Sequence, residues 1–362
     1  MIHIPPHIAN LQPYKPGKPG ANLFDEPPER EVVLSSNENN RGPSPLAMAA
    51  VSAHLEKFSL YPDPVSGALR SALSKRLGVA ETQLCVGNGS DSILYNIMNS
   101  FFSPGQTLLT SEGAFASAKV YARLNQVPMI ETPMLPGYRF DLEAILDAID
   151  ERTQMIYLVN PNNPTGTMIP EAELKQFIER VPEHIIVLVD EAYFEFAGAL
   201  ASDYPDSSRY GYKNVLVLRT FSKAYGLAGL RLGFAIGDEF LINVLSKTKL
   251  PFDPNIAAQI AGLAALEDEA FLQATIDNNS AQMQLLAEEY RRLSIPFITS
   301  YANFITLELE NEVRVETVFE GLRRRGVLTR RLASFGLPHC LRVSIGLPEE
   351  NEYYLRQLEA LS

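Results

Sequence analysis

Three nearly continuous apolar runs in the middle of the chain constrain its fold more than any other feature. They are MIYLV (155–159), IIVLVD (185–190) and VLVLRT (215–220). A strand that is apolar on both sides of its pleat needs cover on both faces, which is typical of parallel sheets in α/β proteins. Helical segments intervene, for example 171–180 after Pro170. The pattern therefore predicts an α/β fold with a large, doubly wound and mainly parallel sheet, and a ligand at the carboxyl ends of its strands.

Further elements indicate how the chain is divided. Strands are also expected at 107–110 and 232–236, and a helix at 90–102, where the apolar residues recur on one helical stripe. After about residue 275 the pattern of helices and strands differs from that of the preceding part of the chain. This region is expected to contain a helix at 277–293, a strand at 304–309, a helix at 315–325 that ends at Gly326, a strand at 340–346 and a last helix. These elements predict a smaller α+β domain.

We therefore predict three parts: an N-terminal arm (1–30), a large domain (31–275) and a C-terminal small domain (276–362). Whether the first residues of the large domain pack with the small domain is left open. The arm contains seven prolines. Because proline fixes φ and has no amide proton, the arm is expected to be extended and to lie across another surface, or else to be a frayed terminus.

Composition excludes several classes of function. The 362 residues carry a net charge of −12, which argues against binding to nucleic acid or to an anionic membrane. Neither a signal peptide nor a run of ~18 apolar residues is apparent, so no membrane segment is expected. Two cysteines cannot form a disulfide framework, and the five histidines show no paired ligand spacing, so no metal is expected. A reducing compartment, the cytoplasm, is the expected location.

The strongest chemical signal is TFSKAYGLAGLRLGF (220–234). Lys223 follows an apolar strand inside a loop rich in serine and glycine. Burial near other cations would lower its pKa and give the free amine that imine formation needs. Ser222 and Arg231 could bind a phosphate, the arginine through a forked contact. The alternative is a surface lysine in an ordinary strand–helix loop.

Two further strands end in polar side chains. Asp190 closes the run 185–190, with Tyr193 three residues later, and a buried carboxylate there needs a cation such as a protonated pyridine nitrogen. A helix N-cap or an internal salt bridge would also explain it. In NPNNPTG (160–166) the prolines stiffen the loop, and Asn163 could donate its amide to a phenolate oxygen. An ordinary turn is the alternative.

The segment VGNGSDSIL (86–94) leads directly into the helix expected at 90–102. The amides of Gly89, Ser90 and Asp91 would then form an anion site at the helix N-terminus. The segment lacks both the Walker pattern and GxGxxG, so a nucleotide site is not expected.

These four segments, in this order along the chain, resemble the fold-type I aminotransferases that use pyridoxal 5′-phosphate (PLP). Four other segments narrow the resemblance to the histidinol-phosphate aminotransferases and extend it over nearly the whole chain. They are YKPGKP (14–19), NENNRGPSP (37–45), YPD (61–63) and CLRVSIGLPEEN (340–351). Aromatic aminotransferases and a threonine-phosphate decarboxylase share much of this scaffold.

The resemblance implies a role for each matching residue. Lys223 would bind PLP covalently and then move the proton, and Asp190 would pair with the pyridine nitrogen. The remaining cofactor contacts implied are Asn163 and Tyr193 at the 3′ oxygen, Phe115 on the ring face, and Ser90, Asp91, Ser222 and Arg231 around the phosphate. Tyr61 would reach the cofactor phosphate of the neighbouring subunit, so the resemblance implies a homodimer with shared sites.

The substrate residues also follow from the resemblance. Arg342 would bind the α-carboxylate of glutamate or 2-oxoglutarate. Tyr14 and Arg330 would bind the phosphate of histidinol phosphate, with a short strand in GVLTRRL (326–332) directing Arg330 inward; a solvated charge in a basic run is the alternative for this arginine.

The implied activity is exchange of an amino group between L-histidinol phosphate and 2-oxoglutarate in histidine biosynthesis. An aromatic amino-acid aminotransferase, or an enzyme like threonine-phosphate decarboxylase, is the alternative. A DNA-binding regulator with an aminotransferase-like domain is not expected, because no basic helix-turn-helix precedes residue 30.

Overall fold

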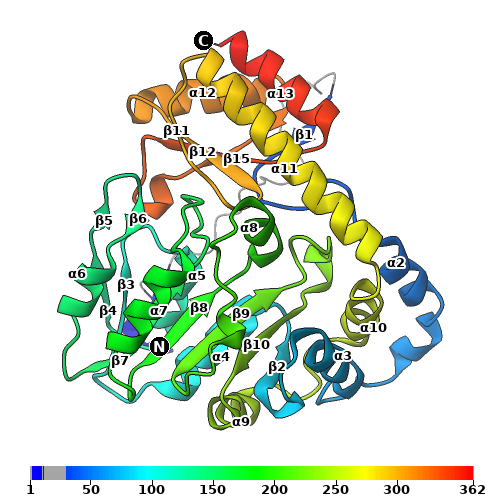
Figure 1. Cartoon of the computed structure of the whole chain (residues 1–362), viewed down its shortest axis with the longest axis vertical. Helices are drawn as coiled ribbons and strands as arrows, with labels where there is room; N and C mark the ends of the chain where they lie inside the picture. Colours follow the sequence, from blue (N-terminus) through cyan, green and yellow to red (C-terminus); the bar gives the residue numbers. More distant parts are fainter. Residues whose placement is uncertain (1, 10, 12–29, 362) are drawn as a thin grey trace.

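The computed structural model describes residues 2–9, 11 and 30–361. Most of these residues form a layered α/β body, and the C-terminal elements form a smaller layer beside it, at the top of Figure 1. The doubly wound α/β fold predicted from the apolar runs is confirmed. None of the helices in the described ranges is both long enough and apolar enough to span a membrane.

A seven-stranded sheet forms the centre of the larger body. Its spatial order is β2 (Leu84–Gly87), β10 (Gly233–Gly237), β9 (Val215–Thr220), β8 (Ile186–Asp190), β7 (Thr153–Val159), β3 (Thr107–Ser111) and β4 (Met129–Thr132). The strands β9, β8, β7, β3 and β4 pair in parallel, whereas β10 is antiparallel to both of its neighbours. All five predicted strands of this sheet are confirmed. Two strands were not predicted: β2, which leads into the glycine-rich segment, and β4, a half-exposed edge strand.

Helices cover both faces of this sheet, as its apolar strands require. Figure 1 shows α7 and α4 on opposite faces. The helices of the larger body are α2 (Pro45–Ser52), α3 (Gly67–Leu77), α4 (Ser90–Phe101), α5 (Ala116–Leu124), α6 (Leu142–Asp147), α7 (Glu171–Arg180), α8 (Phe194–Leu200), α9 (Glu239–Thr248) and α10 (Ile256–Ala265). The predicted helices at 90–102 and 171–180 correspond to α4 and α7. The side chains Ile93, Leu94, Ile97 and Met98 of α4 are buried, as the predicted apolar stripe requires.

The C-terminal part contains an antiparallel four-stranded sheet with its own hydrophobic core. Its strands, in order, are β11 (Phe297–Ile298), β12 (Phe304–Glu308), β15 (Cys340–Ser344) and β14 (Arg330–Arg331), and its helices are α11 (Glu269–Arg292), α12 (Glu312–Arg324) and α13 (Pro348–Glu359). The predicted elements are all present, and Gly326 adopts the expected left-handed conformation after α12, with φ 79°. Helix α11, however, begins eight residues before its predicted start at 277 and crosses the proposed domain boundary at 275.

The start of the continuous described chain belongs to this smaller core. Strand β1 (Val32–Val33) pairs in parallel with β13 (Val327–Leu328), and Val32 and Leu34 are buried among the hydrophobic residues of the C-terminal part. The question left open from the sequence is therefore answered: these residues pack with the C-terminal elements. The limits of the predicted domains remain predictions.

The prediction of an extended arm is wrong for its first residues. Residues Pro6–Ala9 form one turn of helix, α1, next to α5. Pro6 stands at the first helical position, where a missing amide proton costs nothing and the fixed φ suits the helix. Residues 12–29 lie outside the described residues, and Tyr14 with them.

Candidate active site

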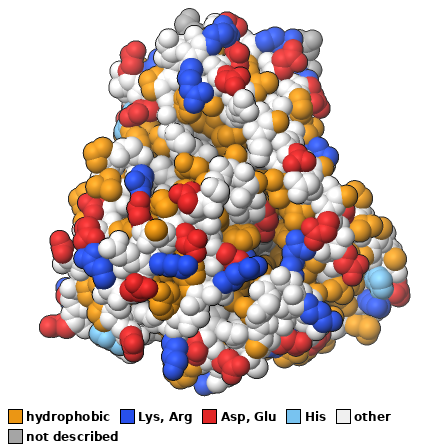
Figure 2. Space-filling model, viewed as in Figure 1, with side chains coloured by type: hydrophobic (Ala, Val, Ile, Leu, Met, Phe, Trp, Pro, Cys, Tyr) orange, Lys and Arg blue, Asp and Glu red, His pale blue; other side chains and the backbone are white. Residues whose placement is uncertain are grey.

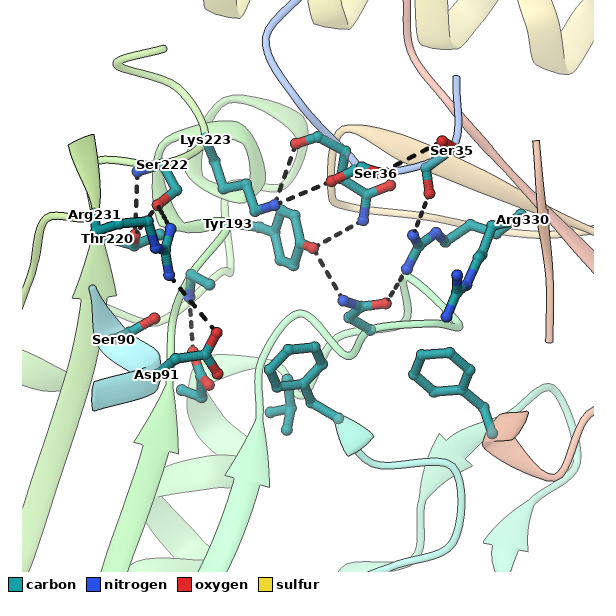
Figure 3. Close-up of a pocket in the computed structure, with 18 residues that line it drawn as sticks. Ser35, Ser36, Ser90, Asp91, Tyr193, Thr220, Ser222, Lys223, Arg231 and Arg330 are labelled. Atoms are coloured by element: carbon teal, nitrogen blue, oxygen red, sulfur yellow. Dashed lines mark hydrogen bonds and ion pairs between the residues drawn. The ribbon is translucent and has the colours of Figure 1, made fainter. Parts of the chain in front are cut away.

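A cavity of about 210 Å³ opens where β7, β8 and β9 end, between the larger body and the C-terminal part (Figure 3). This is the position predicted for a ligand at the carboxyl ends of parallel strands. The cavity brings together most of the residues singled out from the sequence. They are Ser90, Asp91, Phe115, Asn163, Asp190, Tyr193, Ser222, Lys223, Arg231, Arg330 and Arg342.

Lys223 lies in the loop after β9, and its amine points into the middle of the cavity. The Nζ atom donates to the carbonyl oxygens of Ser36, at 3.4 Å, and Asn37, at 3.2 Å. Burial lowers the pKa of Lys223 to about 8, and the nearby positive charge of Arg342 acts in the same direction. A surface lysine is therefore excluded, and a neutral, nucleophilic amine is within reach near neutral pH.

Asp190 is the last residue of β8, and only 4% of it is exposed. Its carboxylate accepts hydrogen bonds from the Tyr157 hydroxyl, at 2.9 Å, and from the Ala192 amide, at 3.2 Å. Both donors are neutral, and desolvation raises the pKa of Asp190 to about 7. Because a cation beside the carboxylate would offset this cost, Asp190 is suited to a positively charged nitrogen of a ligand.

Neither alternative for Asp190 holds. Helix α8 begins after Tyr193, which occupies the N-cap position. The internal salt bridge is formed by the next residue, since Glu191 pairs with Arg219 at 2.7 Å and both side chains are buried.

Tyr193 and Asn163 meet at one wall of the cavity. The Asn163 Nδ2 atom donates to the Tyr193 hydroxyl at 3.2 Å, and the side chain of Arg342 donates to Asn163 Oδ1. Arg342 comes from β15 and also donates to the carbonyl oxygen of Ser35 at 2.9 Å. The loop 160–166 is therefore more than an ordinary turn, because Asn163 connects Tyr193 to Arg342 of the C-terminal part.

The opposite end of the cavity can hold an anion. Arg231 lies 3.3 Å from the Ser222 hydroxyl, to which it donates, and 3.8 Å from the Asp91 carboxylate. The first amides of α4 have no acceptor within the helix, and its N-terminus favours negative charge. Glycine suits position 89, because its φ is +83° and a Cβ atom there would lie 2.7 Å from Arg231 Nη2 and displace this side chain. A dianionic phosphate fits these donors.

Arg330 enters the cavity from β14, whose two residues pair with β15. Side chains alternate along a strand, and the next residue, Arg331, points away and pairs with Glu316. The predicted strand that directs Arg330 inward is therefore present, and this half-buried arginine lines the cavity instead of the outer surface. Phe335, from the turn after β14, lines the cavity beside it.

Tyr61 is placed away from the cavity of its own chain. It is 79% exposed, and its ring stacks on Phe252 with centroids 4.4 Å apart. Tyr14, the other tyrosine singled out from the sequence, belongs to the residues not described. Among the residues that the structure does describe, no group of three or more His, Cys, Asp or Glu side chains could hold a metal ion.

Three functional contacts were missed by the sequence analysis. Tyr157 supports Asp190, Asn37 supports Tyr193, and the carbonyl oxygen of Ser36 accepts from Lys223. A lone hydroxyl in the apolar run 155–159 could have indicated Tyr157. No signal in the sequence indicates a backbone carbonyl, because any residue type supplies one.

The sequence is similar to one protein family and to curated proteins over nearly its whole length. The family model for class I and II aminotransferases matches residues 29–358. Histidinol-phosphate aminotransferase 2 of Pseudomonas fluorescens is 41% identical over 360 residues, which cover 98% of this chain and 95% of that protein. The histidinol-phosphate aminotransferase of Bacillus subtilis is 38% identical over 357 residues, covering 98% of each chain.

The fold was also compared with solved structures. The histidinol-phosphate aminotransferase of Sinorhizobium meliloti, solved in complex with pyridoxal-5′-phosphate, superposes with a TM-score of 0.90 at 25% identity. The superposition covers 100% of this chain and 98% of that chain. The likeness therefore extends over the larger body and the C-terminal part together.

Proposed function

Because the chain belongs to the class I and II aminotransferase family, we propose that it is a PLP-dependent aminotransferase acting on L-histidinol phosphate and 2-oxoglutarate. The products are imidazole acetol phosphate and glutamate, and the place of the reaction is histidine biosynthesis. The curated relatives and the solved structure described above support this substrate by their names. The observation that carries the proposal is one cavity that holds a low-pKa amine, a buried carboxylate, an anion site and two arginines.

The residues present fit PLP at each of its polar groups. The buried Asp190 carboxylate has only neutral donors, and it would pair with the pyridine nitrogen. Tyr193 and Asn163 would bind the phenolic oxygen, and Phe115 would lie on the ring face. Ser90, Asp91, Ser222 and Arg231 would hold the phosphate. When bound, PLP supplies an electron sink that weakens the Cα–H bond of the amino substrate, which no side chain can do alone.

Lys223 has two tasks in this proposal. Its neutral amine would hold PLP covalently, and the pKa of about 8 keeps part of the amine unprotonated at neutral pH. As a free amine, Lys223 would also be the base that takes the proton from Cα of the amino substrate and would donate it back. The carbonyl oxygens of Ser36 and Asn37 accept from Nζ and hold it over the middle of the cavity.

The two arginines from the C-terminal part divide the substrates between them. Arg342 would bind the α-carboxylate of glutamate, and Arg330 would bind the phosphate of histidinol phosphate as a bidentate donor. Tyr14 is proposed as a second donor to this phosphate.

We also propose a homodimer in which Tyr61 reaches the cofactor phosphate of the partner. Large hydrophobic side chains are exposed around Tyr61 in α2, in the following segment to residue 65, and at 250–252, and such a surface is typical of an interface. They are Leu46, Met48, Leu55, Phe58, Leu60, Val65, Leu250 and Phe252. In Figure 2 hydrophobic side chains gather at the lower right, where α2 lies. A tyrosine that is 79% exposed and remote from its own cavity is available to a second copy.

The cytoplasm is the proposed location. Cys85 and Cys340 are both buried and unpaired, which is compatible with a reducing compartment.

A single-turnover assay tests the proposed reaction. The purified, PLP-loaded protein would be mixed with one amino donor at a time, and conversion of the cofactor to its amino form followed by absorbance. Glutamate and histidinol phosphate should both react, and unphosphorylated histidinol should react much more slowly. A preference for phenylalanine would contradict the proposal and indicate an aromatic aminotransferase. Release of CO₂ from threonine phosphate would contradict it and indicate a decarboxylase.

A further inference from the structure

We propose that Asn37 is a positioning residue that directs the hydroxyl proton of Tyr193 into the cavity. In the proposed function, which this inference rests on, the hydroxyl would donate a hydrogen bond to the phenolic oxygen of PLP. Asn37 lies in the loop after β1, between the C-terminal part and the larger body. Its side chain is removed from solvent, with 1% of the residue exposed.

The orientation of the Asn37 amide is fixed by Ser344. The Ser344 hydroxyl accepts from the Asn37 backbone amide at 2.9 Å and donates to Asn37 Oδ1 at 2.9 Å. The amide oxygen is thereby occupied, and the Nδ2 atom faces Tyr193, to which it donates at 2.9 Å. The backbone of Asn37 has φ 55°, a left-handed conformation that Asn, Asp and Gly adopt at little cost.

These contacts decide what the Tyr193 hydroxyl can do. A phenolic hydroxyl has one proton and two acceptor positions. The amides of Asn37 and Asn163 donate to it, at 2.9 and 3.2 Å, so both acceptor positions are used. The proton is therefore left to be donated in the remaining direction, toward the ligand. Asn163 alone would leave one acceptor position open and the direction of the proton undetermined.

The backbone of Asn37 is also held in place, and Tyr193 remains protonated. The Asn37 carbonyl oxygen accepts from Lys223 Nζ at 3.2 Å and from the Asn303 side chain at 3.2 Å. Burial raises the pKa of Tyr193, Asp190 acts in the same direction, and Arg342 and the two amides act against it. The hydroxyl therefore remains a neutral donor whose direction depends on its neighbours.

The substitution Asn37→Asp tests this role, since aspartate has the same shape and tolerates the same φ. Its carboxylate accepts a hydrogen bond from the Tyr193 hydroxyl instead of donating one to it, so the hydroxyl proton points away from the ligand. A lost donor makes the phenolic oxygen of PLP more basic. We expect the pH midpoint of the visible absorption change of the bound cofactor to rise by about one unit or more. We also expect kcat to fall about tenfold, a change of about 1.4 kcal/mol in the barrier.

Two comparisons separate this effect from an added charge. Asn39→Asp places the same charge two residues away, on a side chain that contacts Ala224 and Thr275 instead of Tyr193, and it should shift the midpoint much less. In a Tyr193→Phe background, Asn37→Asp should shift the midpoint no more than Asn39→Asp does, since the proton it redirects is absent.

The outcomes are distinct. If Asn37→Asp acts no more strongly than Asn39→Asp, or equally in the Tyr193→Phe background, Asn37 is only structural and the inference fails. If the wild type forms no absorption band with PLP, the proposed function fails instead. Should Asn37→Asp not fold, Asn37→Gly keeps the left-handed backbone without adding charge. A smaller rise of its midpoint that vanishes with Tyr193→Phe supports the proposal, and an unchanged midpoint overturns it.

Discussion

Replacing Asp190 by asparagine should stabilise the cofactor-free protein while it impairs the enzyme. The carboxylate is buried, and its hydrogen-bond donors, Tyr157 and Ala192, are neutral. Asparagine has a similar shape, and its oxygen can still accept from the tyrosine. The substitution therefore removes the charge and little else.

The size of the effect follows from the pKa. Burial moves the pKa of Asp190 from 3.8 to about 7. Each unit corresponds to about 1.4 kcal/mol, so the ionised carboxylate costs the cofactor-free fold up to about 4 kcal/mol. Because the folded pKa is the higher one, the folded state holds the proton longer. The cost is absent below about pH 4, grows between pH 4 and 7, and is complete above pH 7.

Urea unfolding of the cofactor-free proteins at pH 5 and pH 8 measures this cost. Asp190→Asn should be more stable than wild type at pH 8, and the difference should shrink by about 2–3 kcal/mol at pH 5. In the PLP-loaded enzyme the same substitution should be harmful. The turnover of Asp190→Asn should fall below that of the wild type by ~10²-fold or more, which corresponds to about 3 kcal/mol of transition-state stabilisation. A variant that is less stable than wild type by the same amount at both pH values would refute the reasoning.

Three further predictions concern the proposed roles. Borohydride should fix PLP onto Lys223, and Lys223→Ala should bind PLP without turnover; peptide mapping that finds the label on another lysine rejects this. Arg330→Ala should cost ~2–4 kcal/mol with histidinol phosphate and less with glutamate, whereas Arg342→Ala should impair glutamate at least as much, as single-turnover absorbance with each substrate would measure. Inactive Lys223→Ala and Tyr61→Ala chains, refolded together, should regain activity in mixed dimers, and a fully active monomer would contradict the shared site.

Much of the fold could be predicted because its signals are local. The runs 155–159, 185–190 and 215–220 are apolar on both faces, and this pattern is typical of a parallel sheet covered on both sides. Strand β4 was missed because it lies at the edge of the sheet and is half exposed, so its sequence MIET has no apolar run. The early start of α11 was missed because its first turns, from Glu269, were not distinguished from the preceding loop.

The residues of the site whose side chains carry the chemistry could be predicted from the sequence. The backbone groups and the side chains that support them could not. Lys223 and Asn163 follow apolar strands and Asp190 ends one, and such positions converge at one edge of a parallel sheet. Asn37, by contrast, does not lie at the end of one of these apolar runs. Its contact with Tyr193 depends on β1 lying against the C-terminal part, which is a long-range pairing that no local pattern reveals.

The pairing of β1 with β13 also has a consequence for how the chain is made. Val32 pairs with Val327, and Val33 pairs with Leu328. Strand β1 is therefore synthesised well before β13, the strand with which it pairs. Contacts this far apart in sequence are slow to form. The larger body, whose sheet is complete once β10 has been synthesised, can fold during that interval. The segment around Val32 would meanwhile remain an unpaired apolar strand, and such a strand can pair with other chains and aggregate.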